Sequence, residues 1–237
     1  MQMKTTFVKK IALALCVFSF WSGYAQAGVV VGGTRVVYDG AKREASLSVS
    51  NPDKTPYLIQ SWADNDGPDG KQKAGAKPPF VVTPPLFRLE PRGENLLRII
   101  RTGGALPEDR ESVFWLNVKS IPSAPQGERN VLQIAVKTRI KLFYRPQGLP
   151  RMSDDSYQQV SFQRQGNQLQ VSNPTPYFLS FFSLKVNGQT VDTTNVMVPP
   201  KGSASYRLPT SAAGSQVSWQ LINDYGGTSK VFASPLK

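Results

Sequence analysis

Histidine is absent from this chain of 237 residues, and cysteine occurs only once, at position 16. Without histidine, neither a Ser-His-Asp nor a Cys-His nucleophile can be assembled. The same shortages remove the side chains that most often hold zinc, copper or haem. We therefore expect no metal site and no cofactor, and only an enzyme that works with carboxylates alone stays open at this point.

A hydrophobic run long enough to cross a membrane is also missing. The longest apolar stretch, Ile11–Phe20, is preceded by three lysines and followed by the small residues of Ala25-Gln26-Ala27. A membrane-spanning helix needs roughly 20 apolar residues, so this layout favours a secretory signal peptide over a membrane anchor. We predict cleavage after Ala27 and a mature chain of residues 28–237.

Cys16 lies inside this leader, which raises lipidation as another alternative. The residue before it is Leu15, whereas a lipoprotein processing site requires a small residue there. Removal of the leader would leave no cysteine and hence no disulfide. Apolar cores alone must then hold the exported domains together, which is feasible at about 100 residues each.

The formal net charge is +12, and loss of the three leader lysines would leave +9. The basic residues are scattered along the chain and form no run. A basic chain favours anionic partners, but an exported protein rarely meets nucleic acid. We interpret most of this charge as solvated surface, and we expect neither a nucleic-acid partner nor stable membrane insertion.

The residues between the turns alternate with a period of two, and helical periodicity is almost absent. Nineteen glycines and nineteen prolines punctuate the alternating runs. Short alternating strands between turn residues predict an all-β sandwich fold. The runs in question are 45–49, 113–121, 131–144, 168–171, 177–186, 203–208 and 216–222.

Two similar turn phrases suggest that the chain contains two such sandwiches. Ser50-Asn51-Pro52 is followed by Thr55-Pro56-Tyr57, and Ser172-Asn173-Pro174 by Thr175-Pro176-Tyr177. A coincidence between common turns is the alternative, but the spacing matches one domain. The segment 145–150, rich in Pro and Gly, is a short boundary. We predict a leader at 1–27 and two domains, 28–147 and 148–237.

The run from Val131 to Arg145 is the longest alternating segment. Leu132, Ile134 and Val136 share one face with Ile140, Leu142 and Tyr144, while Lys137, Arg139 and Lys141 lie on the other. At ~3.3 Å per residue this strand would far exceed the usual length, so part of its apolar row should be exposed, on the N-terminal side. The residues alone leave two readings open, an ordinary core strand and an edge that binds a partner strand.

Several stretches resemble the PapD-like periplasmic chaperones of the chaperone–usher pathway, which assemble pili (fimbriae). The resemblance covers nearly the whole mature chain, in order. It is carried by Asn130–Pro146, Thr34–Gly40, Thr83–Pro91, Asp109–Ser112 and Ile222–Gly227. It implies two immunoglobulin-like β-sandwich domains at a fixed angle with a cleft between them, a periplasmic location, and no enzymatic activity.

The resemblance also implies a mechanism, donor-strand complementation, in which the chaperone lends a strand to an incomplete pilus subunit. Leu132, Ile134 and Val136 would fill the groove of the subunit. Arg35 and Lys141 match the cleft pair that grips the C-terminal carboxylate of the subunit. Expected partners are therefore pilus subunits in a one-to-one complex and an outer-membrane usher, and the free chain is expected as a monomer or a weak self-capping dimer.

Two further sets of residues follow from the resemblance. One is an interdomain ion network of Glu111, Arg145 and Asp224. The other is a surface for the usher or an adhesin, formed by Leu58, Gln60, Thr83, Pro84, Pro85 and Ile121, of which Leu58 and Ile121 could equally be core. The short connection after Ile121, with no flanking cysteine pair, resembles the short-loop branch of the family.

Two other functions are compatible with parts of the sequence. The segment Asp64–Gly70 could suggest calcium or a pair of catalytic carboxylates, but it lacks a closing Glu and enough oxygen ligands, and its Gly, Pro and Asp favour a turn. A secreted immunoglobulin-like adhesin or structural pilus component would share the fold class. Such a protein offers no reason for paired cations at Arg35 and Lys141.

Overall fold

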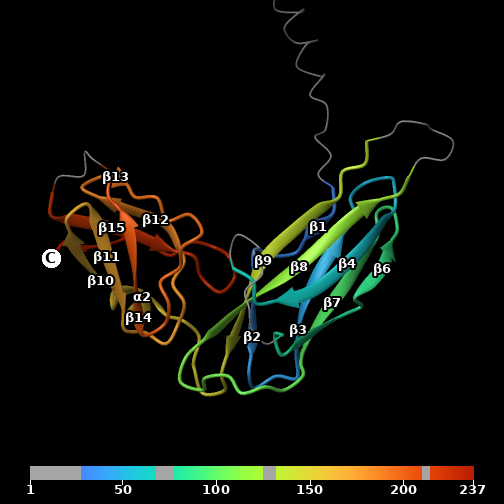
Figure 1. Ribbon diagram of the computed structural model, residues 1–237, viewed down its shortest axis with the longest axis horizontal. Coiled ribbons are helices and arrows are strands. Elements are labelled where there is room, and N and C mark those ends of the chain that lie inside the picture. The colour runs from blue at the N-terminus through green and yellow to red at the C-terminus, as the bar shows by residue number, and fades with distance from the viewer. Residues whose placement is uncertain (1–27, 68–76, 125–131, 210–213) are drawn as a thin grey trace, which may run out of the picture.

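The computed structural model describes residues 28–67, 77–124, 132–209 and 214–237. The predicted leader, Asn130, Val131 and the end of the Asp64–Gly70 segment lie outside these residues. Two β-sandwiches follow one another along the chain and meet at one end, so that together they form a V (Figure 1). The prediction of an all-β, two-domain fold is confirmed.

Two sheets pack face to face in the N-terminal domain, with the strand orders β1-β3-β7-β5 and β2-β9-β8-β4-β6 within the described residues. Fully buried side chains such as Val49, Leu97, Leu116 and Leu142 form the core between them. The strands are β1 (Val30–Val31), β2 (Arg35–Asp39), β3 (Glu44–Ser50), β4 (Tyr57–Asp64), β5 (Phe80–Thr83), β6 (Leu86–Leu89), β7 (Glu94–Arg101), β8 (Ser112–Pro122) and β9 (Val136–Arg145).

The C-terminal domain has sheets of order β10-β11-β14 and β13-β12-β15-β16 among its described residues. Its core is a separate cluster that includes Leu169, Leu184 and Trp219. Its elements are α2 (Asp154–Gln158), β10 (Ser161–Gln165), β11 (Gln168–Asn173), β12 (Phe181–Val186), β13 (Gln189–Thr190), β14 (Gly202–Arg207), β15 (Gln216–Leu221) and β16 (Phe232–Pro235). Within the described ranges, no helix is long and apolar enough to span a membrane.

The two Asn-Pro phrases build the same turn, one in each domain. Asn51 and Asn173 are both buried, and each donates from its side-chain amide to the carbonyl oxygen of the residue four positions later, at 2.8 and 2.7 Å. The side-chain oxygen of each accepts the backbone N–H two residues later, at 3.0 Å in both domains. The repeated phrase therefore marks a repeated structure, because a buried asparagine replaces the backbone partners that the turn lacks.

The prediction for the segment 131–144 was wrong in its extent. β9 begins at Val136 and runs to Arg145, while residues 132–135 precede the strand. The physical reason is pairing. The antiparallel partner β8 reaches β9 only as far as Val136, where its register pair is Ser120. A strand is defined by its partners, so apolar alternation beyond that point does not by itself continue the strand.

Candidate functional site

β9 has one edge that is only partly covered. β8 pairs with it from Val136 to Tyr144, whereas β2 pairs on the opposite edge only from Lys141 to Arg145. Within the described residues, the edge of Val136–Ile140 therefore has no strand partner, and we call it the open edge. In Figure 1 this part of β9 lies on the side of the N-terminal domain that faces the C-terminal domain.

Apolar side chains continue this row beyond the covered part of the sheet. Leu132, Ile134 and Val136 are 85%, 68% and 54% exposed. Farther along the same face, Ile140 and Leu142 are buried in the core of the domain. One alternating row is thus divided into a core half and an exposed half, as the sequence predicted for its N-terminal side. Exposed apolar side chains at a strand edge mark an interaction site or an aggregation hazard.

Two cations stand where the open edge ends. Arg35 and Lys141 are register partners in the parallel pairing of β2 and β9. Arg35 Nη1 donates to the backbone oxygen of Ile222 at 3.1 Å, and Lys141 Nζ donates to Ser180 Oγ at 3.1 Å. Ser180 and Ile222 belong to the C-terminal domain, so both cations reach across the junction. The described residues provide neither cation with an ion-pair partner, and leave the buried Nε of Arg35 without a hydrogen-bond acceptor.

The positive charge of this pair is held in a partly dry environment. Burial lowers the pKa of Arg35, although the carboxylates of Asp224 and Glu111 act in the opposite sense. Burial, followed by the charge of Arg35, lowers the pKa of Lys141 to about 8. The charged forms of Arg35 and Lys141 are therefore destabilised in the free chain. An anion bound between them would offset both the loss of hydration and the repulsion between the two cations. Two donors of this kind suit a carboxylate.

A second charged cluster, formed by Arg145, Glu111 and Asp224, connects the two domains. Arg145, at the end of β9, donates to both oxygens of Asp224 at 2.7 Å and to Glu111 Oε1 at 2.8 and 2.9 Å. The other oxygen of Glu111 accepts the backbone N–H of Phe178 at 2.8 Å. The three residues predicted as an ion network therefore lie together, and Glu111 and Arg145 are 3% and 5% exposed. Burial raises the pKa of Glu111, against the opposing charge of Arg145.

The loop after β15 also fits closely against the N-terminal domain. Gly226 has a φ of +83°, and a Cβ placed there would lie 2.5 Å from Thr34 Oγ1. Only glycine tolerates both conditions. This loop carries Ile222 and Asp224, so its close approach delivers the acceptor for Arg35 and the carboxylate for Arg145. Ser180 was not identified from the sequence because it belongs to no pattern that signals binding. Ile222 belongs to a stretch that carries the family resemblance, but it contributes a backbone oxygen, which every residue has.

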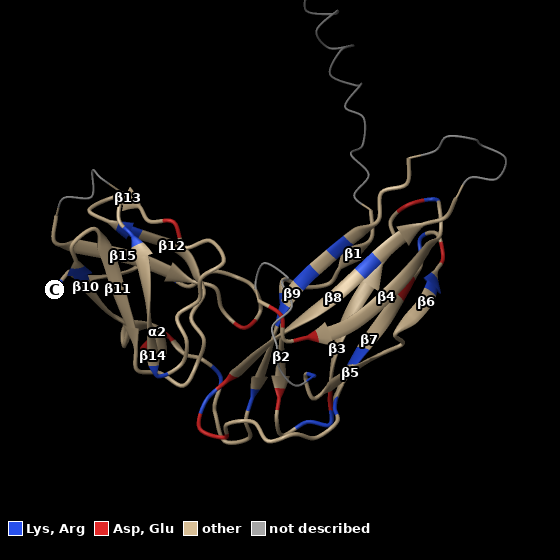
Figure 2. Ribbon diagram, in the orientation of Figure 1, with Lys and Arg blue, Asp and Glu red and all other residues tan. Residues whose placement is uncertain are grey.

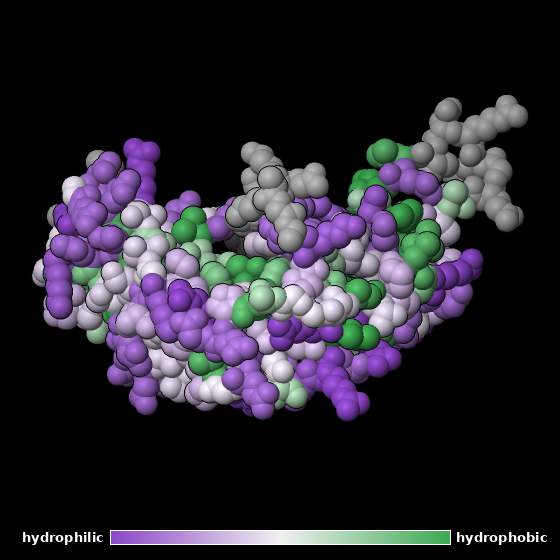
Figure 3. Space-filling model, turned by 60° about the horizontal axis from the view of Figure 1, so that its bottom comes forward, coloured by the Kyte–Doolittle hydropathy of each residue, from purple (hydrophilic) through white to green (hydrophobic). Residues whose placement is uncertain are grey.

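The remaining predicted surface residues gather at the far end of the N-terminal domain. Leu58 and Ile121 are register partners on β4 and β8. Leu58 is 41% exposed and Ile121 is half-buried, so neither belongs to the fully buried core. The turn between β5 and β6, which contains Thr83, Pro84 and Pro85, lies against Ser61, whose Oγ donates to the Pro84 oxygen at 2.7 Å. Gln60 is exposed beside it. Figure 3 shows apolar residues, in green, at the surface of the right-hand end of the molecule, below the grey atoms at the upper right.

These features define a class of binding protein: two immunoglobulin-like sandwiches that present an open strand edge ending at two cations. Family models match both halves, the "Pili and flagellar-assembly chaperone, PapD N-terminal domain" at residues 28–150 and the "Pili assembly chaperone PapD, C-terminal domain" at residues 155–233. The chain belongs to this family of pilus-assembly chaperones, which are not enzymes.

Individual relatives agree with the family models. The probable fimbrial chaperone LpfB of Escherichia coli O157:H7 is 45% identical over 228 residues, 94% of each chain. The structure of the Salmonella enterica SafA pilin in complex with the SafB chaperone matches at a TM-score of 0.79 with 34% identity, over 90% of this chain and 99% of that one. The periplasmic chaperone SfaE matches at 0.72 with 40% identity, over 87% and 98%. An adhesin or structural pilus component is not favoured by these relatives.

Proposed function

We propose that this chain captures incomplete pilus subunits in the periplasm by donor-strand complementation and delivers them to an outer-membrane usher. The observation that carries the proposal is the open edge of β9, which ends at the register pair Arg35 and Lys141. An edge strand supplies main-chain hydrogen bonds, and alternating side chains supply pocket contacts. The charged end fixes the position of the last residue of the bound strand. Capture of a strand-deficient subunit needs all three.

The exposed apolar row supplies most of the binding energy in this proposal. Leu132, Ile134 and Val136 would enter the groove that a missing strand leaves in the subunit. Each such side chain contributes about 1.5–3 kcal/mol when it is fully buried. The alternation also fixes the register, because a slip of one residue would turn every apolar side chain to the wrong face.

The cation pair would bind the C-terminal carboxylate of the subunit. Among the described residues, the buried Nε of Arg35 has no acceptor, and the one partner of Lys141 Nζ is the neutral hydroxyl of Ser180. A carboxylate accepts hydrogen bonds at both oxygens, so one anion can satisfy both cations. The anchor would thereby fix where along the open edge the last residue of the subunit lies.

The buried network of Glu111, Arg145 and Asp224 has a supporting role in this scheme. It contacts no ligand position directly, but it links the end of β9 to the loop that carries Ile222. A guanidinium bound by two carboxylates is a rigid link, because its planar fork fixes the directions of the hydrogen bonds. We assign to it the maintenance of the domain angle and hence of the cation pair.

The far end of the N-terminal domain is our proposed contact for the usher or an adhesin. Leu58, Gln60 and Ile121 lie on the outer face of the sheet, and the turn of Thr83, Pro84 and Pro85 lies beside them. The structure adds Leu86, the register partner of Gln60, which is 57% exposed. Ile121 follows Ser120, the register partner of Val136, so this surface adjoins the start of the exposed apolar row, and an usher or adhesin bound here would lie beside the captured subunit.

The leader-like layout of residues 1–27 and the description of SfaE as a periplasmic chaperone support export. We propose that residues 1–27 direct secretion and are removed after Ala27, which N-terminal sequencing of the periplasmic protein would test. The free chain would be a monomer or a weak dimer in which two copies cover each other's open edge. The concentration dependence of its mass in solution distinguishes these two states.

Co-expression with a pilus subunit tests the function itself. The chain, purified from periplasm by a C-terminal tag, should carry the subunit in a one-to-one complex by native mass spectrometry. The subunit should be lost when Lys141 is replaced by alanine and retained when the exposed Lys137 is replaced. Recovery of the subunit as a polymer, or equal recovery with the K141A variant, would contradict the proposal.

A further inference from the structure

Arg139 differs from the other cations on its face of β9 because it is buried in a network of the sheet itself. Its side chain is 11% exposed and that of its ion-pair partner, Asp64, is 16% exposed. The guanidinium donates to both carboxylate oxygens of Asp64, at 2.8 and 3.0 Å, and to Asn117 Oδ1 at 3.1 Å. Asn117 is fully buried and donates in turn to Asp64 at 2.8 Å. This is a closed, bidentate arrangement and not a surface ion pair.

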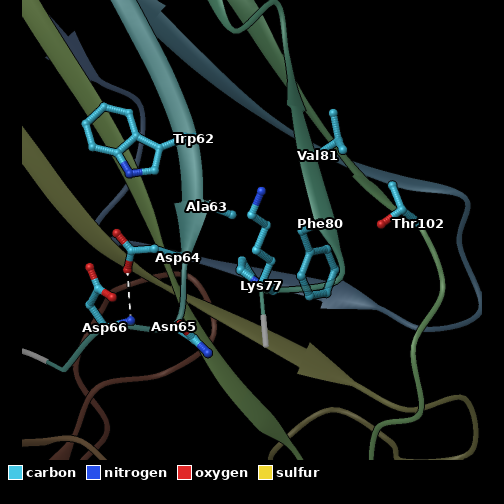
Figure 4. A pocket seen from close by; sticks show the side chains of 10 residues that line it. Trp62, Ala63, Asp64, Asn65, Asp66, Lys77, Phe80, Val81 and Thr102 are labelled. Atoms are coloured by element: carbon cyan, nitrogen blue, oxygen red, sulfur yellow. Dashed lines mark hydrogen bonds between the residues drawn. The ribbon is translucent and has the colours of Figure 1, made fainter. Parts of the chain in front are cut away.

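The network also holds the residues that follow β4. Arg139 Nη2 donates to the backbone oxygens of Asp66 and Gly67, at 3.1 and 3.0 Å. The backbone N–H of Asp66 donates to Asp64 at 3.2 Å, a contact that Figure 4 shows beside the pocket that this segment borders. One guanidinium therefore binds the end of β4 and the residues that follow it. In the segment Asp64–Gly70, for which the sequence suggested a turn or a cation site, Asp64, Asp66 and Gly67 thus bind the side chain of Arg139.

Its position relates the network to both parts of the binding site. Arg139 lies within the open edge, and its register partner on β8 is Asn117. The guanidinium lies 4.8 Å from the centroid of the Trp115 ring, and Trp115 is the register partner of Lys141. Directly opposite side chains on antiparallel strands lie about 4.5–5.5 Å apart at Cβ. The network therefore adjoins the open edge on one side and the cation pair on the other.

We propose that Arg139 is a positioning residue for the donor edge, which it holds in a binding-competent conformation before a subunit arrives. The proposal rests on the strand-donation function above. Val136–Ile140 is attached to the sheet through β8 alone, so it would fray without a further link. The Arg139 fork connects β9 to β4 across β8 and resists that fraying. A pre-ordered edge loses less conformational entropy on binding, which raises affinity without a new contact.

Pairing also concentrates the positive charge where an anion is needed. Lys137, Arg139 and Lys141 follow one another on one face of β9, and Figure 2 shows basic residues along this strand. Asp64 neutralises Arg139, while Lys141 contacts the neutral Ser180 and has no carboxylate partner in the part of the chain that the structure describes. The charge left uncompensated near the junction is then that of Arg35 and Lys141. Lys137 is exposed, so water and salt screen its charge, and a terminal carboxylate is drawn to the partly buried pair and not to the middle of the strand.

Amide hydrogen exchange of the free, full mature chain tests the proposal without a subunit. Replacement of Arg139 by Gln should accelerate exchange of Val136–Ile140 about tenfold, while core strand β3 keeps its rate. Arg139→Lys should give the same acceleration, because lysine keeps the charge but not the fork. Lys137→Gln, a matched loss of charge on the same face, should change nothing. Unchanged exchange at Val136–Ile140, or an equal increase throughout the chain, would overturn the proposal.

Asp64→Asn provides a second route in case the Arg139 variants fold poorly. It removes the carboxylate and keeps the shape, and it should reproduce the local acceleration. A normal exchange rate in D64N would again overturn the proposal, because the fork would then not be what orders the edge.

Binding of a synthetic peptide separates this inference from the anchor. The probe is a peptide of about ten residues with alternating apolar side chains, prepared with a free C-terminal carboxylate and as the C-terminal amide. Arg139→Gln should weaken both forms by the same factor, whereas Lys141→Ala should remove the preference for the free acid. Equal binding by R139Q and the parent chain would overturn the role of Arg139 only. A parent chain with no preference for the free acid would instead contradict the carboxylate anchor.

Discussion

Arg35 and Lys141 stand opposite each other on β2 and β9, and each donates a hydrogen bond across the domain junction. Their juxtaposition is unfavourable in the free chain, because both are partly buried and like-charged. A site that holds two cations together in this way is poised for an anion. The loop of Ile222 and Ser180, the residue before β12, complete it from the other domain.

Replacement of either cation by alanine should therefore affect capture and not folding. Each charge-assisted hydrogen bond contributes about 1.5–3 kcal/mol, so loss of Lys141 should weaken subunit binding at least about tenfold. The free protein should be as stable as the parent or slightly more so, because a repulsion is removed. Denaturant unfolding beside a binding titration checks both points. Unfolding of K141A would show that the lysine is structural.

Subunit binding should weaken as the pH rises through about 8, the pKa of Lys141 in the free chain. A bound carboxylate favours the charged lysine, so the complex takes up a proton above this pH. The stability of the free chain should move in the opposite direction. The pKa of Lys141 is about 8 in the folded chain and near 10.5 in the unfolded chain. Between these two pH values the unfolded state binds more protons, so the free energy of unfolding rises with pH.

Titrations of the parent chain and of Lys141→Arg between pH 6 and 10 check this dependence, since arginine stays charged throughout the range. A parent chain whose affinity does not change over this range would argue against a role for the Lys141 charge.

A charge placed on the exposed half of the β9 row should abolish capture without unfolding the chain. Ile134 is 68% exposed, and Ile134→Asp removes an apolar contact that would contribute about 1.5–3 kcal/mol to the complex. Ile140→Asp is the matched control on the same face of β9, and it should unfold the N-terminal domain because Ile140 is 7% exposed. Circular dichroism and subunit recovery together check the pair. Unfolding of I134D would place Ile134 in the core.

Loss of the Arg145 side chain should loosen the domain angle. Removal of one member of a buried ion network leaves Glu111 without its cation, which costs about 3–5 kcal/mol. Arg145→Met should lower the unfolding midpoint and broaden the distribution of distances in small-angle scattering. Arg88→Ala, which breaks an exposed pair with Glu90, is the control and should change neither. A scattering profile of R145M identical to that of the parent would show that the angle is held by other contacts.

The sequence predicted the fold well because its signals are local. Period-two alternation predicted β3, β8 and β15, and the Asn-Pro phrases predicted the repeated turn because a turn depends on a few adjacent residues. The extent of β9 was missed for a complementary reason. Whether Leu132 or Ile134 belongs to a strand depends on how far the pairing with β8 continues, and alternation carries no information about that.

The site was predictable only in part. Resemblance to a family named Arg35, Lys141 and the three residues of the interdomain network, but composition alone gave no reason to prefer them over other charges. Arg139 was interpreted as a solvated charge and is instead buried against Asp64, 75 residues earlier in the chain. Contacts of this kind form between strands that are adjacent only in the folded sheet, so no local pattern announces them.

The central claim is that the open edge of β9 pairs with a strand of the captured subunit. Amide exchange of Val136–Ile140 in the purified one-to-one complex, compared with the free chain, tests it most directly. Main-chain pairing at this edge should slow exchange there at least about tenfold, and the amides of Lys141–Arg145, already paired with β2, should change much less. Exchange at Val136–Ile140 that stays the same in the complex would contradict the account, because the subunit would then be held elsewhere.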